Sequence, residues 1–356
     1  MAGDRLRSGT RPPSMHDVAL VAQVSHQTVS RVLNAHPSVR EETRQLVQAA
    51  ISELGYRRNS AARALVTSRT GTIGVLTTGS ALYGPIGTLV ALEEAAREAG
   101  YFVSVATLRR FDAAAMARVL EHFMAQRVEG IVVIAPQDVV AAAVDAFRAP
   151  VPVVMIAARP EGEGASTVGA PGHTVSVSVD QRLGARLATE HLLGLGHGTV
   201  AHLGGPEDWF DAREREVGWE QTLRDAGTPV PEVMRCDWSA ERGYEAGKRL
   251  AGLVLAGEGP TAVFASNDQL ALGLVHACAE AGVDVPGRLS VVGFDDVQGA
   301  AHFNPPLTTV RQPFDELGRR ALVAMLDALA LEPDDHGRAL IAPELVVRAS
   351  TAAPSH

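Results

Sequence analysis

Cysteine is scarce in this sequence. Cys236 and Cys278 are the only two among 356 residues, and they form neither a CxxC pair nor any other zinc-binding spacing. We therefore expect no metal site and no cofactor, and we interpret the two cysteines as buried thiols in a reducing cytoplasm.

Long apolar runs are also missing. No stretch of about 18 apolar residues is present, which excludes a membrane-spanning helix. The N-terminal stretch MAGDRLRSGTRPPS is basic and has no apolar core, so it is not a signal peptide. These absences predict a cytoplasmic protein.

The sequence motifs of common enzymes are absent too. The chain has no phosphate-binding loop, no HExxH and no GxSxG. The segment GLGHG at 194–198 is better explained as the end of a helix than as a dinucleotide-binding loop. Asp295 and Asp296 could pose as an acid–base pair, but nothing nearby resembles a nucleophile. We therefore expect a protein that is not an enzyme.

Charge is distributed unevenly along the chain. Residues 1–70 contain ten Arg, no Lys and five acidic residues, which gives a formal charge of +5. The remaining residues contain 22 basic and 36 acidic groups, which gives -14. A basic segment attracts the phosphates of nucleic acid, and an acidic body repels them. This asymmetry predicts two parts with different functions.

Two short helices are predicted near the N-terminus. The first begins at Ser14, because SMHD has the S-x-x-D form of a capped helix start. The second begins with Ser25 as its N-cap. Their apolar stripes consist of Val18, Ala19, Ala22, Val29, Val32 and Leu33.

A third helix is predicted to begin at the segment SVRE, a capping box from Ser38 to Glu41, and to end at Gly55. Its inward residues are expected to be Val39, Leu46, Val47, Ala50 and Leu54. Two short helices joined by a tight turn and backed by a third make a helix-turn-helix.

The exposed side of the second helix has the chemistry of a DNA-reading surface. Gln27 can pair with adenine and Arg31 with guanine, while Thr28 or Ser30 can bond a phosphate. The alternative is a small helical bundle with a solvated polar face.

The segment YRRNSAARALVTSRTG at 56–71 is basic and alanine-rich. Asn59 can cap a helix there, but a helix this short is marginal in water unless DNA or a second copy holds it. Leu65 has little local core to join, so it could wedge between base steps in the minor groove. The alternative is a linker whose leucine packs on the next domain.

Residues 71–356 alternate between short apolar strands and helices, beginning with GTIGVLTT and ending near LSVVGFDD. This pattern predicts an α/β core of two doubly wound parallel sheets, covered by helices on both faces. Ligands of such sheets bind beyond the carboxyl ends of the strands.

Polar and aromatic side chains follow several of these strands. They are Asn267 and Asp268 in FASND, Asp295 and Asp296 in VVGFDD, Arg213 and Arg215 in GPEDWFDARERE, and Trp238 in CDWSAERG. Carboxylates and amides bond paired hydroxyls, and an indole face covers ring C–H groups, so a polyhydroxylated ligand would fit. The alternative for each residue alone is a helix cap or a solvated ion.

These motifs together resemble the lac repressor family (LacI/GalR), from about Ser14 to Ala352. The resemblance is carried by DVALVAQVSHQTVSRVLN, ELGYRRNSAARAL, CDWSA, ASNDQLALG, SVVGFDD and PPLTTVRQPF. The last four are most similar to the lactose-responsive branch. The resemblance implies a helix-turn-helix, a hinge helix and a core like that of periplasmic sugar-binding proteins.

The resemblance also implies domain boundaries. They comprise a disordered tail (1–13), the helix-turn-helix (14–57), the hinge (58–70), the ligand-binding and dimerisation core (71–347) and a second tail (351–356). The core would have an N-subdomain of 71–179 and 314–339 and a C-subdomain of 181–311 and 341–350, with crossovers near 179–181, 312–314 and 339–344.

Site residues follow from the same resemblance. The DNA-binding residues would be Ser25, His26, Gln27, Thr28, Ser30, Arg31, Asn34, Asn59, Ala62 and Leu65, with Leu65 intercalating at the centre of a pseudo-palindromic operator. The sugar would be held by Arg215, Asn267 and Asp295, between apolar walls of Trp238, Phe314 and Leu82, with Tyr83 and Gln312 on matching segments.

Three departures from the family pattern are present. Gln23 stands where the family has a glycine in the tight turn, so a positive φ there would be strained. Ala157 stands where the lactose-responsive branch has an aspartate that helps to bind sugar. The chain ends VVRASTAAPSH, without the leucine heptads of a tetramer, which predicts a homodimer.

The resulting interpretation is a repressor that binds double-stranded operator DNA and is released by a sugar inducer, with a galactoside as first choice. One alternative is a regulator whose ligand is a corepressor that strengthens DNA binding. A transport binding protein and an oxidoreductase are further alternatives, and the DNA-reading segment and the missing nucleotide motif argue against them.

Overall fold

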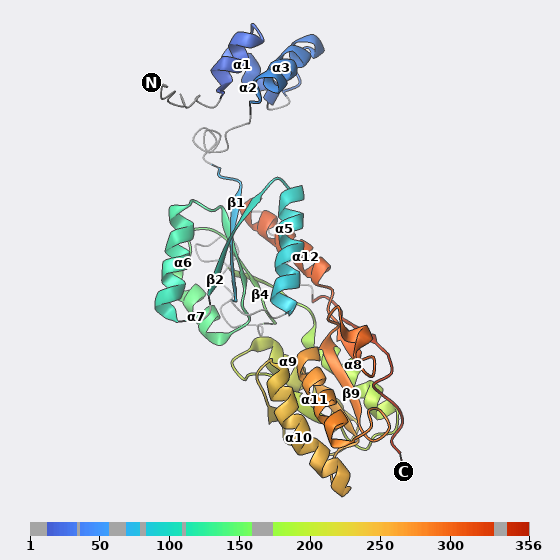
Figure 1. Cartoon of the computed structure of the whole chain (residues 1–356). Coiled ribbons are helices and arrows are strands. Elements are labelled where there is room, and N and C mark those ends of the chain that lie inside the picture. Colours follow the sequence, from blue (N-terminus) through green and yellow to red (C-terminus); the bar gives the residue numbers. More distant parts are fainter. Residues whose placement is uncertain are drawn as a thin grey trace, which may run out of the picture. The chain divides into compact units, whose positions relative to one another are not determined.

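The computed structural model describes residues 13–33, 36–56, 69–78, 83–108, 112–158, 174–330 and 340–355. The chain divides into two compact units, Met1–Thr70 and Gly71–His356 (Figure 1). Five of the predicted site residues lie outside the described residues, namely Asn34, Asn59, Ala62, Leu65 and Leu82. Most of the predicted hinge, 58–70, and most of the predicted N-terminal tail, 1–13, do so as well.

Three helices form the N-terminal unit: α1 (Met15–Val21), α2 (His26–Leu33) and α3 (Glu41–Leu54). The predicted cap of α1 is confirmed, since Asp17 N–H donates to Ser14 Oγ and the Asp17 carboxylate accepts from Ser14 N–H at 2.8 Å. The core contains Val18, Ala19, Ala22, Val29, Val32, Val47 and Ala50. The predicted helix-turn-helix architecture is therefore present.

The start of α3 differs from the prediction. Arg40, not Ser38, is the N-cap residue, and Ser38 donates its N–H to His36 Nδ1 and places its Oγ 2.8 Å from the same atom. Because the imidazole engages Ser38, the capping box is not formed. The prediction that Leu46 faces inward is also wrong, because its side chain is 57% exposed. The predicted stop at Gly55 is confirmed by its φ of 60°.

The first sheet of the large unit has five parallel strands in the order β2-β1-β3-β4-β5. They are β1 (Thr72–Thr78), β2 (Phe102–Leu108), β3 (Gly130–Ile134), β4 (Val153–Ile156) and β5 (Thr174–Val177). Helices α5 (Tyr83–Glu98) and α12 (Phe314–Ala330) cover one face, and α6 (Ala113–Ala125) and α7 (Asp138–Phe147) cover the other (Figure 1).

The second sheet has six strands in the order β11-β10-β9-β8-β6-β7. They are β6 (Ala201–Gly204), β7 (Met234–Arg235), β8 (Ala262–Ala265), β9 (Ser290–Asp295), β10 (Thr308–Arg311) and β11 (Glu344–Val346). Strand β11 pairs antiparallel to β10, which corrects the prediction of purely parallel sheets.

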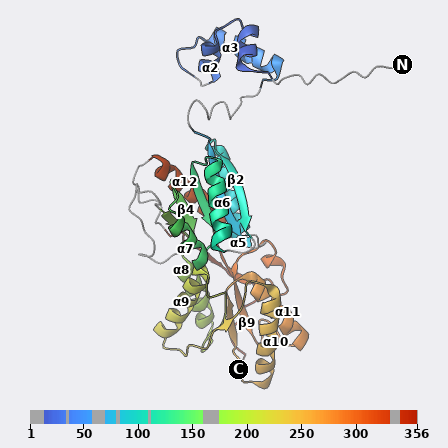
Figure 2. The same ribbon diagram turned by 90° about the vertical axis from the view of Figure 1, so that its left-hand side faces the viewer.

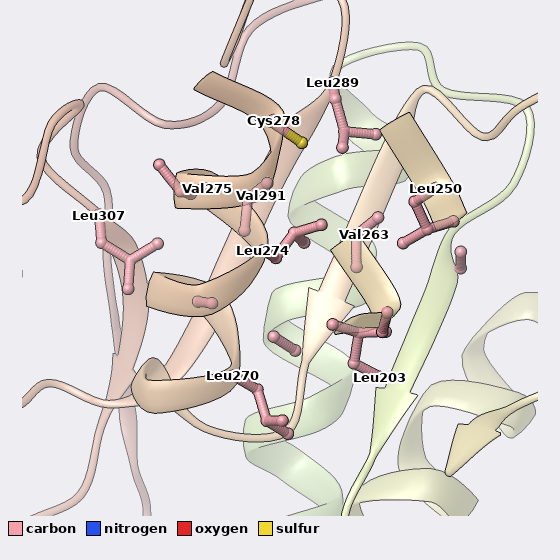
Figure 3. Close-up of a cluster of buried hydrophobic side chains, with 14 of the residues drawn as sticks. Leu203, Leu250, Val263, Leu270, Leu274, Val275, Cys278, Leu289, Val291 and Leu307 are labelled. Carbon is pink, nitrogen blue, oxygen red and sulfur yellow. The ribbon is translucent and has the colours of Figure 1, made fainter. Parts of the chain in front are cut away.

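Two helices cover each face of this sheet. Helices α8 (Gln181–Gly194) and α9 (Phe210–Asp225) lie on one face, and α10 (Ala240–Ala256) and α11 (Asp268–Ala281) lie side by side on the other (Figures 1 and 2). A short helix, η1 (Ala300–His302), follows β9. Cys278 is a buried residue of α11 (Figure 3). Cys236 is only half-buried, contrary to expectation.

The chain passes three times between the two sheets. It leaves the first sheet after β5, returns after β10 to form α12, and leaves again before β11. Two of the passing segments are bonded to each other, since Ile341 N–H donates to Ser178 O at 3.0 Å and Asp180 N–H donates to Ile341 O at 2.9 Å. None of the described helices is long and apolar enough to cross a membrane.

Candidate functional site

A cavity of about 460 Å³ lies between the two sheets, within the size range of small-molecule sites. Its lining includes residues at or just beyond the carboxyl ends of strands in both sheets: Ile134, Ile156, Ala157, Ser178, Asn267, Asp295 and Gln312. This is the position that parallel α/β sheets use for ligands.

The structure brings most of the predicted ligand-binding residues together in this cavity. Its lining contains Tyr83, Arg215, Trp238, Asn267, Asp295, Gln312 and Phe314. They come from separate stretches of the chain, so their convergence results from the fold and not from local sequence.

Four polar side chains form a closed ring in the cavity wall. Arg215 Nε donates to Gln181 Oε1 at 2.8 Å, and Gln181 Nε2 donates to Gln312 Oε1 at 2.9 Å. Gln312 Nε2 donates to Asp295 Oδ1 at 2.7 Å, and Arg215 Nη2 lies 3.8 Å from the same oxygen. Gln181 and Gln312 stand on two of the segments that pass between the sheets, so the ring joins the cavity to those passages.

The Arg215 guanidinium is buried within this ring. Its Nη1 donates to Ser266 O, and its Cζ lies 3.8 Å from the centre of the Phe294 ring, a cation–π arrangement. Burial lowers the pKa of Arg215, and the charge of Asp295 opposes that shift. The guanidinium is therefore fixed in one orientation toward the cavity.

The Asp295 carboxyl is poised to change its charge near neutral pH. Burial raises its pKa to about 6, against the opposing charge of Arg215 and the hydrogen bond from Gln312. Its backbone has a φ of 112°, and that of Asp296 is 52°, so two consecutive residues occupy the region that favours glycine.

Asp296 does not share the cavity with Asp295. Its carboxylate accepts from Arg311 Nε at 2.7 Å and from Arg348 Nη2 at 2.6 Å. Those ion pairs hold the strained turn after β9. The two aspartates therefore do not form an acid–base pair.

The predicted strand-end residues of the FASND segment both serve the fold. Asn267 caps α11, since its Oδ1 accepts from Leu270 N–H at 2.8 Å and its Nδ2 donates to Trp238 O at 3.1 Å. One N–H of the Asn267 amide remains for the cavity. Asp268 does not line the cavity; its carboxyl accepts from Thr309 Oγ1 and Val297 N–H.

Arg213, like Asp268 and Asp296, does not line the cavity, contrary to the prediction. It was predicted to supply the cleft, but its Nη1 and Nη2 both lie 2.8 Å from the Asp138 carboxylate on α7. Phe210 N–H donates to Pro136 O at 2.9 Å next to this pair. These contacts bridge the two sheet units beside the cavity.

Several cavity residues were not assigned to the site from sequence, among them Gln181, Trp209 and Asp211. Gln181 completes the polar ring, and Trp209 and Asp211 line the cavity from the start of α9. Asp211 and Arg215 are spaced i,i+4, which puts both on one helix face. This spacing in the segment DWFDARER could have indicated that Asp211 lies beside Arg215.

On α2 of the N-terminal unit, the predicted DNA-reading face is presented to solvent. His26, Gln27 and Arg31 are exposed, whereas Ser25 and Thr28 are engaged in the helix start, with Thr28 N–H donating to Ser25 Oγ at 3.1 Å. Gln23 has a φ of 52°, the positive value that a glycine turn position requires.

Two family models match the chain. The model of bacterial regulatory proteins of the lacI family matches residues 14–59, which contain the three helices of the first unit. The model of the periplasmic binding protein-like domain matches residues 189–351 in the second unit.

Known proteins are similar over almost the whole chain. The lactose operon repressor of Escherichia coli is 35% identical over 97% of this chain and 92% of that protein. The ribose operon repressor of the same species is 32% identical over 95% and 99%. A crystal structure of the lac repressor dimer bound to operator and an anti-inducer has a TM-score of 0.82 and 34% identity, over 96% of this chain and all of that one. This chain belongs to the LacI family of bacterial regulatory proteins.

Proposed function

We propose that this LacI-family DNA-binding transcriptional repressor is released from its operator by a small neutral sugar that binds between its two sheets. The observation that carries the proposal is the ring of Arg215, Gln181, Gln312 and Asp295 in the wall of an otherwise largely apolar cavity. Donors and acceptors fixed next to one another suit the adjacent hydroxyls of a sugar.

Aromatic side chains support the same ligand class. Tyr83 and Phe314 meet edge to face with ring centres 5.7 Å apart, and Trp238 also lines the cavity. Such faces cover the C–H surface of a sugar ring while the polar groups bond its hydroxyls. A galactoside is the first ligand to test, because the motifs around Trp238 and Asp295 resemble the lactose-responsive branch.

The DNA half of the proposal rests on α2. His26, Gln27 and Arg31 would read base edges in the major groove, and Leu65 would wedge into the minor groove between two half-sites. A homodimer supplies two such helices for a pseudo-palindromic operator. A protein that acts on the chromosome in this way acts in the cytoplasm.

Release would come from a shift between the two sheet units. Gln181 and Gln312 connect the cavity to the segments that pass between these units, so a sugar that bonds Asp295 and Arg215 would bias their relative position. The change in operator affinity equals the ratio of the sugar's affinities for the two states.

A fluorescence-anisotropy titration tests the proposal. The full chain is titrated against labelled DNA from upstream of its own gene, at fixed salt, because phosphate contacts make the affinity salt-dependent. The titration is repeated with galactosides, glucosides and pentoses. We expect one sugar to weaken binding to this DNA and to leave binding to unrelated DNA unchanged.

The sign of the effect separates the alternatives. A ligand that strengthens operator binding would establish the corepressor alternative. Tight operator binding that no sugar in the panel changes would contradict the assignment of the cavity and leave the DNA-binding half intact.

A further inference from the structure

We propose that Asp211, Trp209 and Trp238 form a second subsite of the cavity, which binds the second ring of a neutral disaccharide. The inference rests on the proposed function, because it narrows the class of the sugar. The first ring would lie on the side of Arg215 and Asp295.

The Asp211 carboxylate is positioned from both sheet units. Asp211 belongs to α9, which covers the second sheet, and its Oδ1 accepts the N–H of Ala158, which follows β4 of the first sheet, at 3.0 Å. Ala158 N–H is its one hydrogen-bond donor among the described residues, so Oδ2 is left for a hydroxyl of the ligand. Ala157, the residue before Ala158, also lines the cavity but has no polar side chain. The carboxylate on this side of the cavity is therefore that of Asp211 on α9.

The two tryptophans form an aromatic corner. Their ring centres are 5.4 Å apart and their planes are inclined by 71°, so they offer two surfaces at a steep angle. Gly205 permits this arrangement, because a Cβ there would clash with the six-membered ring of Trp238. A second sugar ring can lie on one indole face and contact the edge of the other.

Trp238 also has a buried donor that lacks an acceptor. No described residue accepts from its indole Nε1–H, although the atom is inaccessible to solvent. A buried donor without a partner is rare in folded proteins and calls for one. A ligand hydroxyl can supply the acceptor after a small shift of the indole ring, because no water-sized group reaches this atom in the structure. Arg215 Cζ lies 5.5 Å from the centre of the Trp238 ring. Trp238 therefore lies next to the proposed position of the first sugar ring as well as that of the second.

The charges of the cavity disfavour anionic ligands. The charged side chains among the described lining residues are two carboxylates, Asp211 and Asp295, and one guanidinium, Arg215. The guanidinium donates to Gln181 and to Ser266 O, and its Nη2 lies 3.8 Å from the Asp295 carboxylate. The one cation is already paired with Asp295, so a sugar phosphate would be repelled by the carboxylates, whereas a neutral disaccharide would not.

Calorimetric titration of the full chain without DNA tests the subsite. The ligands are lactose with galactose, cellobiose with glucose, and galactose 6-phosphate. The variants are Trp209→Ala and Asp211→Asn, with Trp209→Phe as the conservative change. Asp225→Asn is the matched control, since Asp225 is exposed at the other end of α9.

We expect at least one disaccharide to bind about tenfold more tightly than its monosaccharide, and galactose 6-phosphate not to bind. Trp209→Ala and Asp211→Asn should remove about tenfold of the disaccharide affinity and leave that of the monosaccharide within about twofold. Trp209→Phe and Asp225→Asn should retain the preference. Unchanged monosaccharide affinity shows that the variants are folded.

Other results overturn the inference. A monosaccharide that binds as tightly as its disaccharide, or variants that weaken both sugars equally, would contradict the second subsite while the proposed function stands. The absence of binding by any of these sugars would contradict both. A disaccharide that binds through Trp209 and Asp211 without changing operator affinity would support the subsite and contradict the proposed function alone.

Discussion

At the scale of single residues, the proposed sugar site depends on the charge of Asp295. An ionised carboxylate accepts hydrogen bonds from hydroxyls more strongly than a neutral one does. Burial raises the pKa of Asp295 to about 6, so the carboxylate is mostly ionised at pH 7.5 and mostly protonated at pH 5. Hydroxyl donors favour the ionised form, so ligand affinity should fall as the pH drops through 6.

We predict that sugar affinity, measured by calorimetry, decreases between pH 7.5 and pH 5. Asp295→Asn should lower the affinity at pH 7.5 by about tenfold, through the loss of a charged acceptor, and should reduce its pH dependence. Operator affinity without sugar should be unchanged, because Asp295 belongs to the large unit, whereas the predicted DNA-reading helix belongs to the N-terminal unit. An affinity that is equal at both pH values would show that Asp295 does not contact the ligand.

Sequence alone could identify some cavity residues and not others. Arg215, Asn267 and Asp295 stand in recognisable motifs. The i,i+4 spacing to Arg215 could place Asp211 on the same helix face, but its contact with Ala158, 53 residues away and beside the first sheet, could not be read from sequence. Arg213 looked equivalent to Arg215, but the two positions differ in direction around α9, and Asp138 captures the former.

At the scale of elements, helix ends show what local patterns determine. The capped start of α1 and the glycine stop of α3 follow from residues within a few positions, and both were predictable. The start of α3 is also set locally, by His36 two residues before Ser38, but the capping-box pattern takes no account of such a competitor. The antiparallel pairing of β11 was also beyond local signals, since a three-residue strand does not encode its direction.

The turn between α1 and α2 leads to a second prediction. Gln23 has a φ of 52°, which is unfavourable for any residue with a Cβ. Gln23→Gly should stabilise the N-terminal unit by about 0.5 kcal/mol, because the relief of strain exceeds the extra chain entropy of glycine. Hydrogen exchange of the α1 and α2 amides measures this change.

A matched change at the C-terminal end of α3 should alter the stability of the N-terminal unit in the opposite direction. Gly55→Ala places a Cβ on a residue with a φ of 60° and should destabilise the same unit by about 1 kcal/mol. Faster exchange in the Gln23→Gly variant would show that the glutamine side chain contributes more than the strain removes.

At the scale of the whole large unit, the contacts beside the cavity determine how readily the two sheet units separate. Arg213 on α9 holds Asp138 on α7 through both guanidinium nitrogens at 2.8 Å, and Trp209 of the same stretch lines the cavity. The pair therefore stabilises the arrangement in which residues of both sheets surround the cavity. Its side chains are 35% and 53% exposed, so solvent screening limits its contribution to about 1 kcal/mol or less.

We predict that Arg213→Ala weakens sugar binding by up to about fivefold, which corresponds to that limited contribution, because the closed arrangement becomes less populated. More sugar would then be needed for release from DNA, whereas operator affinity without sugar should change little. The exchanged pair Arg213→Asp with Asp138→Arg should recover part of the sugar affinity that either single change removes. A double-mutant cycle isolates this coupling. A coupling of zero would show that the backbone contacts at Pro136 and Phe210 hold the two units together without help from the ion pair.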